Sequence, residues 1–131
     1  MDKKYLSKII ATDNEGLQVI SACCSGAEVK VNEIKYLQKN KVFLLSLKRS
    51  KVETEEQHKK ITSICKFEFV DRVKSKNIKQ NDPEEKLELI GMDYLKNNDN
   101  YEINLMFTNN AYITLSTEII EVTLDDQNKA D

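Results

Sequence analysis

The sequence predicts an α+β domain built mostly from antiparallel β-strands, and three features of the chain lead to this prediction. Apolar and polar residues alternate on both sides of a short turn between Tyr101 and Ser116, which is typical of a β-hairpin. Shorter alternating segments, separated by polar turns, precede it. One segment near the N-terminus instead repeats its apolar residues every three or four positions, as one face of a helix does. About seven such strands would curl into a roll or a partly open barrel.

The hairpin has two possible registers, and burial selects one of them. A two-residue loop at Asn109-Asn110 would mix polar and apolar side chains on both faces of the sheet. A three-residue loop at 108–110 instead places six apolar residues of the hairpin on one face, and Asn110 tolerates the left-handed conformation that such a loop requires. The opposed pairs are then Phe107 with Ala111, Leu105 with Ile113, and Ile103 with Leu115.

The N-terminal part predicts a short strand followed by a helix. Residues 5–10 form the strand, and the helix covers about residues 13–25. Thr12 and Glu15 make a capping box at its start, and Gly26 ends it. The helix presents one apolar face, formed by Leu17, Ile20, Cys24 and Ala27.

The middle of the chain predicts further strands around one polar loop. Residues 49–60 are rich in charge, so we expect an exposed loop there. Ile61–Val73 is the longest strand candidate, and its alternation changes phase near Val70-Asp71, which indicates a bulge or bend. Three shorter strands precede the loop, at residues 28–31, 34–37 and 41–48.

Two later segments complete the predicted elements. Residues 87–95 form another strand with a phase change near Gly91, where we expect a bulge or a close approach of backbone. Residues 81–83 make a turn around the only proline. Residues 117–125 are ambiguous, because their apolar side chains are spaced both two and four apart and fit a strand as well as a helix.

Composition limits the class of protein. The 131 residues suit one domain, which we place at 1–126 with a disordered tail at 127–131. The net charge of −2, from 20 basic and 22 acidic residues, provides no overall field that would attract nucleic acid or an anionic membrane. The apolar runs are shorter than a membrane span, and the first residues lead into no signal-peptide core, so we expect a cytosolic protein without a membrane partner.

The residue types that carry metal or redox chemistry are sparse. Cys23, Cys24 and Cys65 lack the paired spacing of a zinc site and are interpreted as small buried thiols in a reducing compartment. His58 is the only histidine, and it lies in the polar loop. No nucleophile or metal ligand is spaced to act with it. We therefore expect no catalytic residue, no metal site and no cofactor.

Several short stretches, in the same order along most of the chain, are similar to those of a known family. They are Ile10–Asp13, Leu17–Ala22, Val31–Leu37, Phe67 with Asp71–Val73, Leu87–Met92, Phe107–Leu115 and Glu118–Glu121. In these stretches the chain resembles a small alphaproteobacterial family catalogued only as a domain of unknown function. Members carry glycines at the positions of Asn109 and Asn110, and they are helical after the last strand. The resemblance thus implies a closing helix at Thr117–Asp125, and it implies no activity. The chain departs from the family at Lys48-Arg49-Ser50.

Two groups of residues are candidates for a site. Arg72, Lys74 and Lys76 alternate along the end of the long strand, and Arg49 belongs to a second basic group. If the two strands pair, these residues would merge into an anion-binding patch for phosphate-bearing ligands. Asp71 and Arg72 also sit at the predicted bend, where a bulge can aim side chains at a functional site or hold a structural ion pair.

Three classes of function remain open. The first is a non-enzymatic binding or adaptor module with a protein partner, on a roll that is pleckstrin-homology-like by topological analogy. The second is a weak binder of nucleic acid or phosphate ligands through the basic strand face. The third is an enzyme that uses scattered carboxylates, such as Asp93, Asp99 and Glu102. An unpaired edge strand or an apolar patch would favour the first, a continuous positive groove the second, and a pocket with converging carboxylates the third.

Overall fold

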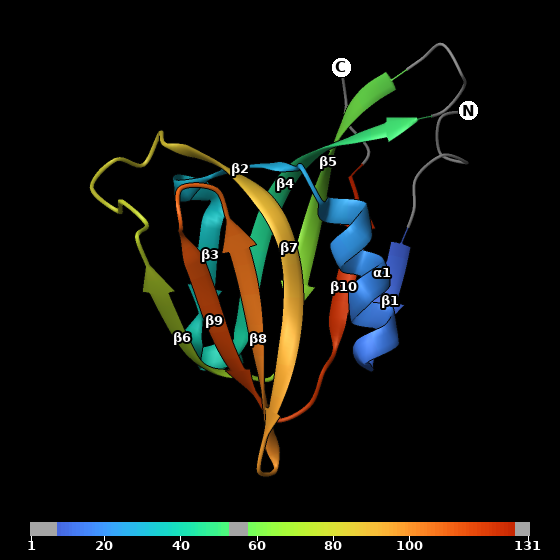
Figure 1. Cartoon of the computed structure of the whole chain (residues 1–131), viewed down its shortest axis with the longest axis vertical. Helices are drawn as coiled ribbons and strands as arrows, with labels where there is room; N and C mark the ends of the chain where they lie inside the picture. The colour runs from blue at the N-terminus through green and yellow to red at the C-terminus, as the bar shows by residue number, and fades with distance from the viewer. Residues whose placement is uncertain (1–7, 53–57, 128–131) are drawn as a thin grey trace.

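The computed structural model describes residues 8–52 and 58–127, which contain one α-helix, two short 3-10 helices and ten strands (Figure 1). The elements are β1 (Lys8–Ala11), α1 (Asn14–Cys24), β2 (Glu28–Lys30), η2 (Val31–Glu33), β3 (Ile34–Leu37), η3 (Gln38–Asn40), β4 (Val42–Val52), β5 (His58–Phe67), β6 (Val70–Lys76), β7 (Lys86–Asn97), β8 (Asn100–Phe107), β9 (Tyr112–Thr117) and β10 (Val122–Asp126). The α+β class with a mostly antiparallel sheet is confirmed.

The strands form one curled antiparallel sheet that does not close. Its order is β1-β10-β5-β4-β2-β7-β8-β9-β6, and β3 pairs with β4 beside this path. Figure 1 shows α1 between β7 and the pair β1 and β10; it packs on β7 and β1, and its apolar face joins the core. At 11 residues, α1 is too short to cross a bilayer, and no other helix in the described ranges is long enough either.

The predicted number of strands is wrong. The segment expected to be a loop at 49–60 continues β4 to Val52 and starts β5 at His58; residues 53–57 lie outside the described part. The long strand expected at Ile61–Val73 is two strands, because Phe69 adopts a left-handed conformation with φ of 59° and turns the chain between β5 and β6. The two halves then join different neighbours, β4 and β10 for β5, and β9 for β6.

The closing C-terminal helix is also wrong, because β10 occupies its place. β10 pairs with β5 on one side and with β1 on the other. Ile120, Val122 and Leu124 are buried at two-residue spacing. This ambiguous segment therefore follows the alternation of a strand and not the spacing of a helix. The pleckstrin-homology-like analogy thereby loses the helix on which it depended.

The predicted hairpin register is confirmed between β8 and β9. The Phe107 amide donates to the Ala111 carbonyl at 2.8 Å, and Asn110 has a φ of 57°. The further pairs are Leu105 with Ile113 and Ile103 with Leu115. All six apolar side chains of the hairpin are at most 2% exposed, as the argument from burial required.

Both predicted irregularities are bulges. One shifts the register of β6 against β9 between Val70 and Arg72, and the other shifts β7 against β8 at Gly91. At the second bulge the helix comes close to the sheet. A Cβ on Gly91 would lie 3.4 Å from Oγ of Ser21, and that hydroxyl accepts a hydrogen bond from the Met92 amide at 2.8 Å.

The helix has the predicted face but a different cap. Asp13, not Thr12, is the N-cap, and its Oδ1 accepts from the Gly16 amide at 2.8 Å. The helix ends before Gly26, which has a φ of 85° and donates its amide to the Leu89 carbonyl. Leu17, Ile20 and Cys24 form the buried face of α1 as predicted, whereas Ala27 is buried but lies beyond the end of the helix.

Candidate binding site at strand β6

β6 is an edge strand that faces a second edge without pairing with it. It pairs with β9 on one side, and within the described ranges no strand pairs with its other side, which turns toward β3. At one end, hydrogen bonds join β6 to β3 and to Lys41, which follows η3. There the Val70 amide donates to the Lys41 carbonyl at 2.8 Å, and the Tyr36 hydroxyl donates to the Val70 carbonyl at 2.8 Å. Beyond Val70 the edges separate.

The hydrogen-bond pattern of the hairpin identifies the backbone groups on the free edge of β6. Phe107 and Ala111 form a hydrogen-bonded pair, and such pairs alternate with non-bonded pairs along an antiparallel ladder. Every second residue of β9, starting at Tyr112, therefore directs its backbone toward β6. Their partners are Arg72 for Ser116, Lys74 for Thr114 and Lys76 for Tyr112. Val73 and Ser75, between these pairs, direct their N–H and C=O groups outward.

A mostly apolar pocket of about 350 Å³, which we call the β3–β6 pocket, lies where the two edges separate. Val73 and Ser75 line it, so the residues with free backbone groups also place their side chains at the pocket. The loop at 77–85 bounds it and is held by the Val31 amide on the Glu85 carbonyl. The lining residues are Val31, Asn32, Ile34, Tyr36, Phe43, Val73, Ser75, Ile78, Gln80, Pro83 and Ile113.

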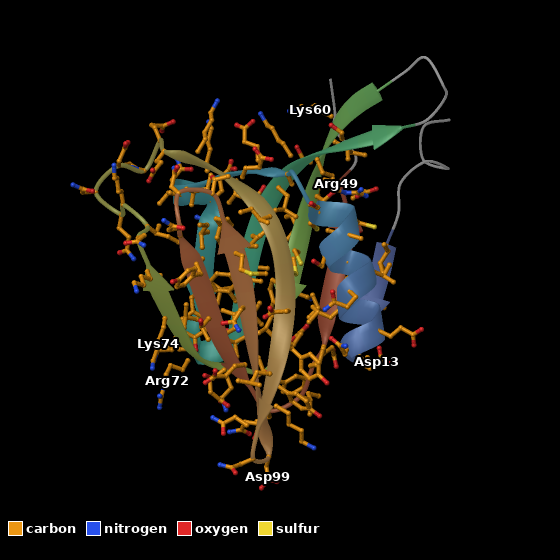
Figure 2. All side chains as sticks on the ribbon, in the orientation of Figure 1. Asp13, Arg49, Lys60, Arg72, Lys74 and Asp99 are labelled. Atoms are coloured by element: carbon orange, nitrogen blue, oxygen red, sulfur yellow. The ribbon has the colours of Figure 1, made fainter. Side chains whose placement is uncertain are left out.

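The opposite face of β6 carries Arg72, Lys74 and Lys76, which we call the basic row. All three side chains are exposed, and Figure 2 shows Arg72 and Lys74 projecting from the margin of the roll. Their neighbours across the ladder, Ser116, Thr114 and Tyr112, are neutral. Within the described residues none of the three forms an ion pair, and Lys76 Nζ lies 5.9 Å from the ring centre of Tyr112. No direct ion pair in the described structure therefore neutralises the basic row.

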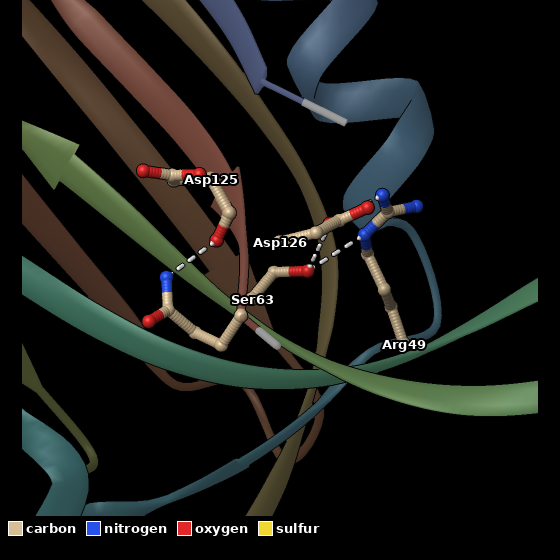
Figure 3. A network of polar contacts seen from close by, with 5 residues as sticks. Arg49, Ser63, Asp125 and Asp126 are labelled. Carbon is tan, nitrogen blue, oxygen red and sulfur yellow. Dashed lines mark hydrogen bonds and ion pairs between the residues drawn. The ribbon is translucent and has the colours of Figure 1, made fainter. Parts of the chain in front are cut away.

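Arg49 lies apart from the basic row, because β4 and β6 do not pair. Its side chain is buried, with the residue only 8% exposed. Nη2 donates to Asp126 at 2.8 Å, and Nε donates to Oγ of Ser63 at 3.0 Å (Figure 3). The Ser63 hydroxyl donates in turn to Asp126 at 2.7 Å. This buried network links β4, β5 and β10, and the expected merger of Arg49 with the basic row does not occur.

Asp71 and Arg72 lie at the bulge of β6, as expected from the phase change. Asp71 forms an ion pair with Lys41, Oδ1 to Nζ at 3.0 Å, and its hydrogen bond and charge raise the pKa of Lys41 above the usual value. Both residues border a polar pocket of about 320 Å³. Its other lining residues are Asn97, Asn98, Asn100, Tyr101, Glu102 and Ser116.

The remaining candidates do not converge. Asp93 lies on β7 and accepts from Nδ2 of Asn104 at 3.3 Å, Asp99 lies in the turn between β7 and β8, and Glu102 borders the polar pocket. His58 lies in β5, opposite Val52, instead of in a loop. In the part of the chain that the structure describes, no group of three or more His, Cys, Asp or Glu residues is placed to hold a metal ion.

Two of the cysteines form a buried pair inside the roll. Cys24 at the end of α1 and Cys65 on β5 are fully buried free thiols that contact each other, whereas Cys23 is half-buried. The hydrogen bond from Cys65 lowers the pKa of Cys24, and burial raises the pKa of Cys65. Their packing agrees with the interpretation as small core residues.

Comparison with known proteins identifies a family. A family model described as a protein of unknown function (DUF2948) matches residues 7–131. No curated protein and no solved structure matches the chain.

Proposed function

Because the chain belongs to the DUF2948 family, whose function is unknown, we propose a function from the geometry of the site. The protein is a non-enzymatic binding module that takes up an extended segment of a partner protein. That segment adds as a strand to the free edge of β6 and inserts side chains into the β3–β6 pocket.

One observation carries this proposal: free backbone groups and an apolar pocket occur at the same two residues. Val73 and Ser75 offer outward N–H and C=O groups, and their side chains line a pocket of about 350 Å³. In recognition by strand addition, main-chain hydrogen bonds supply affinity, and pockets for alternate side chains supply specificity. The pocket volume is also within the range of ligand sites, roughly 300 to 1,000 Å³.

A proline at Ser75 tests the proposal, because the Ser75 N–H is directed away from β9. Proline is tolerated at such an edge position but removes the donor that an added strand would use. The probe is a displayed library of random decapeptides, selected on the wild-type protein, on Ser75→Pro and on Ser75→Ala. We expect the wild type and Ser75→Ala to enrich the same peptides and Ser75→Pro to lose them. Equal enrichment on all three proteins, or none on the wild type, would contradict the proposal.

A second variant tests the pocket independently of the backbone. Val73 is partly buried and lines the pocket, so Val73→Phe extends a larger apolar side chain into that space. We expect peptides enriched by the wild type to bind this variant less tightly. The matched control is Val19→Phe on α1, an exposed position away from the pocket, which should leave binding unchanged.

The second candidate function is weak binding of nucleic acid or phosphate ligands through the basic row. The observation in its favour is that Arg72, Lys74 and Lys76 have no acidic partner in the described structure. An electrophoretic mobility shift with single-stranded RNA and DNA at low salt tests it, with Arg72→Glu plus Lys74→Glu as the variant. A complex that the variant abolishes would favour this function over the first.

A further inference from the structure

We propose that the partner segment on β6 alternates apolar and acidic residues. This inference rests on the proposed function and names the chemistry of the occupant. Its apolar side chains enter the β3–β6 pocket, and its carboxylates lie beside the basic row.

The two faces of β6 determine the pattern. An added strand continues the pleat of its neighbour, so its successive side chains fall alternately on the pocket face and on the outer face. On the pocket face the neighbours are Val73 and Ser75, with Ile34, Tyr36 and Ile113 around the cavity. Large apolar side chains are suited to these positions, since they remove apolar surface of both partners from water.

On the outer face the neighbours of the added strand are Arg72, Lys74 and Lys76. These three residues repeat at a spacing of two, which is also the spacing of outer-face positions on the added strand. β9 places only neutral side chains opposite them, so the unmatched positive charge faces the open side of the sheet. Oppositely charged cross-strand pairs stabilise pairing, whereas like charges oppose it. Aspartate or glutamate at every second position of the segment fits this arrangement.

The alternative role of the basic row is protection. Lysines on an edge strand discourage pairing with the edges of other molecules and need no ligand. A protective role predicts that reversing these charges leaves the charge preference of bound peptides unchanged. An acidic partner predicts that the preference reverses with them.

The experiment repeats the decapeptide selection on Lys74→Glu plus Lys76→Glu. The control is Lys48→Glu plus Lys60→Glu, which changes the net charge equally at exposed positions on β4 and β5. We expect the wild type and the control to enrich alternating apolar and acidic peptides, and the β6 variant to enrich lysine or arginine at the acidic positions. A synthetic acidic peptide should bind the β6 variant on the order of tenfold more weakly at low salt.

The outcomes distinguish a wrong acidic partner from a wrong binding module. If the wild type enriches peptides that Ser75→Pro loses, but without acidic alternation or without reversal on the β6 variant, the acidic partner is wrong and the binding module stands. If Ser75→Pro enriches the same peptides as the wild type, the binding module itself is wrong. Binding of RNA by the basic row with no selection of acidic peptides would also overturn the inference.

Discussion

Removal of Asp126 should destabilise the protein strongly, because its carboxylate is the acceptor for two buried donors. Asp126 accepts from Arg49 at 2.8 Å and from Ser63 at 2.7 Å, and both side chains lie inside the roll. Asp126→Ala leaves the guanidinium buried without its counter-charge. Removing one partner of a buried ion pair costs about 3–5 kcal/mol, so we expect a loss of this size in the free energy of unfolding.

The assay is urea denaturation at neutral pH, followed by far-ultraviolet circular dichroism. With a slope of about 2 kcal/mol per molar urea, the midpoint should fall by roughly 2 M. Arg49→Met should also destabilise the protein, since it removes the positive charge that the buried Asp126 carboxylate faces. The double variant Arg49→Met plus Asp126→Leu should recover much of the loss, because an apolar pair of comparable volume can replace a buried ion pair. A loss below about 1 kcal/mol for Asp126→Ala, or strict additivity in the double variant, would refute the reasoning.

Three further predictions concern the backbone. Asn110→Gly should be neutral or stabilising and Asn110→Val destabilising by about 1–2 kcal/mol, because the residue has a φ of 57°; thermal unfolding midpoints compare the two. Lys74→Pro should destabilise the protein by about 1–3 kcal/mol, since the N–H of Lys74 faces β9. Ser75→Pro should keep the wild-type midpoint in urea. The same midpoint for both variants would contradict the assignment of the outward-facing backbone groups of β6. Gly16→Ala should cost about 1–3 kcal/mol in the same assay, since its Cβ would lie 2.9 Å from Cβ of Ala11.

The hairpin and the bulges could be predicted from the sequence because local patterns determine them. One register buries six apolar side chains of the hairpin together, and a phase change in the alternation marks each bulge. The segment at 117–125 could not be settled in this way. Its spacing satisfies both a strand and a helix, and the decision comes from β1 and β5, which offer edges on either side of β10.

The candidate site was only partly predictable. The basic row was visible in the sequence, since Arg72, Lys74 and Lys76 alternate. Its neighbour was not, because pairing of β6 with β9 instead of β4 joins segments that are far apart in the chain. The β3–β6 pocket is lined by several segments that are separate in the sequence, so no local sequence pattern predicts it.

Unlike the β3–β6 pocket, the burial of Arg49 follows from a local pattern, the alternation of apolar residues along β4. The inward positions of β4 run through Leu45 and Leu47, and Arg49 is the next one. Ser63 likewise extends the buried face of β5, and Asp126 that of β10. Ser63 and Asp126 are directly opposed and Arg49 is the next inward residue of β4 beyond the partner of Ser63, so three neighbouring strands change from apolar to polar on their inward faces at neighbouring levels of the roll.

This arrangement suggests how the apolar core ends near β4, β5 and β10 without the predicted C-terminal helix. The inward face of an open roll must stop at some level, and a polar residue there must find partners when it is buried. Arg49, Ser63 and Asp126 satisfy one another across β4, β5 and β10, so the end of the apolar core is sealed by a fixed network. Because that network also holds β10 in register with β5, a variant that breaks it should loosen β10 before the hairpin of β8 and β9. Amide hydrogen exchange on Asp126→Ala measures this, and uniform loss of protection in both regions would contradict it.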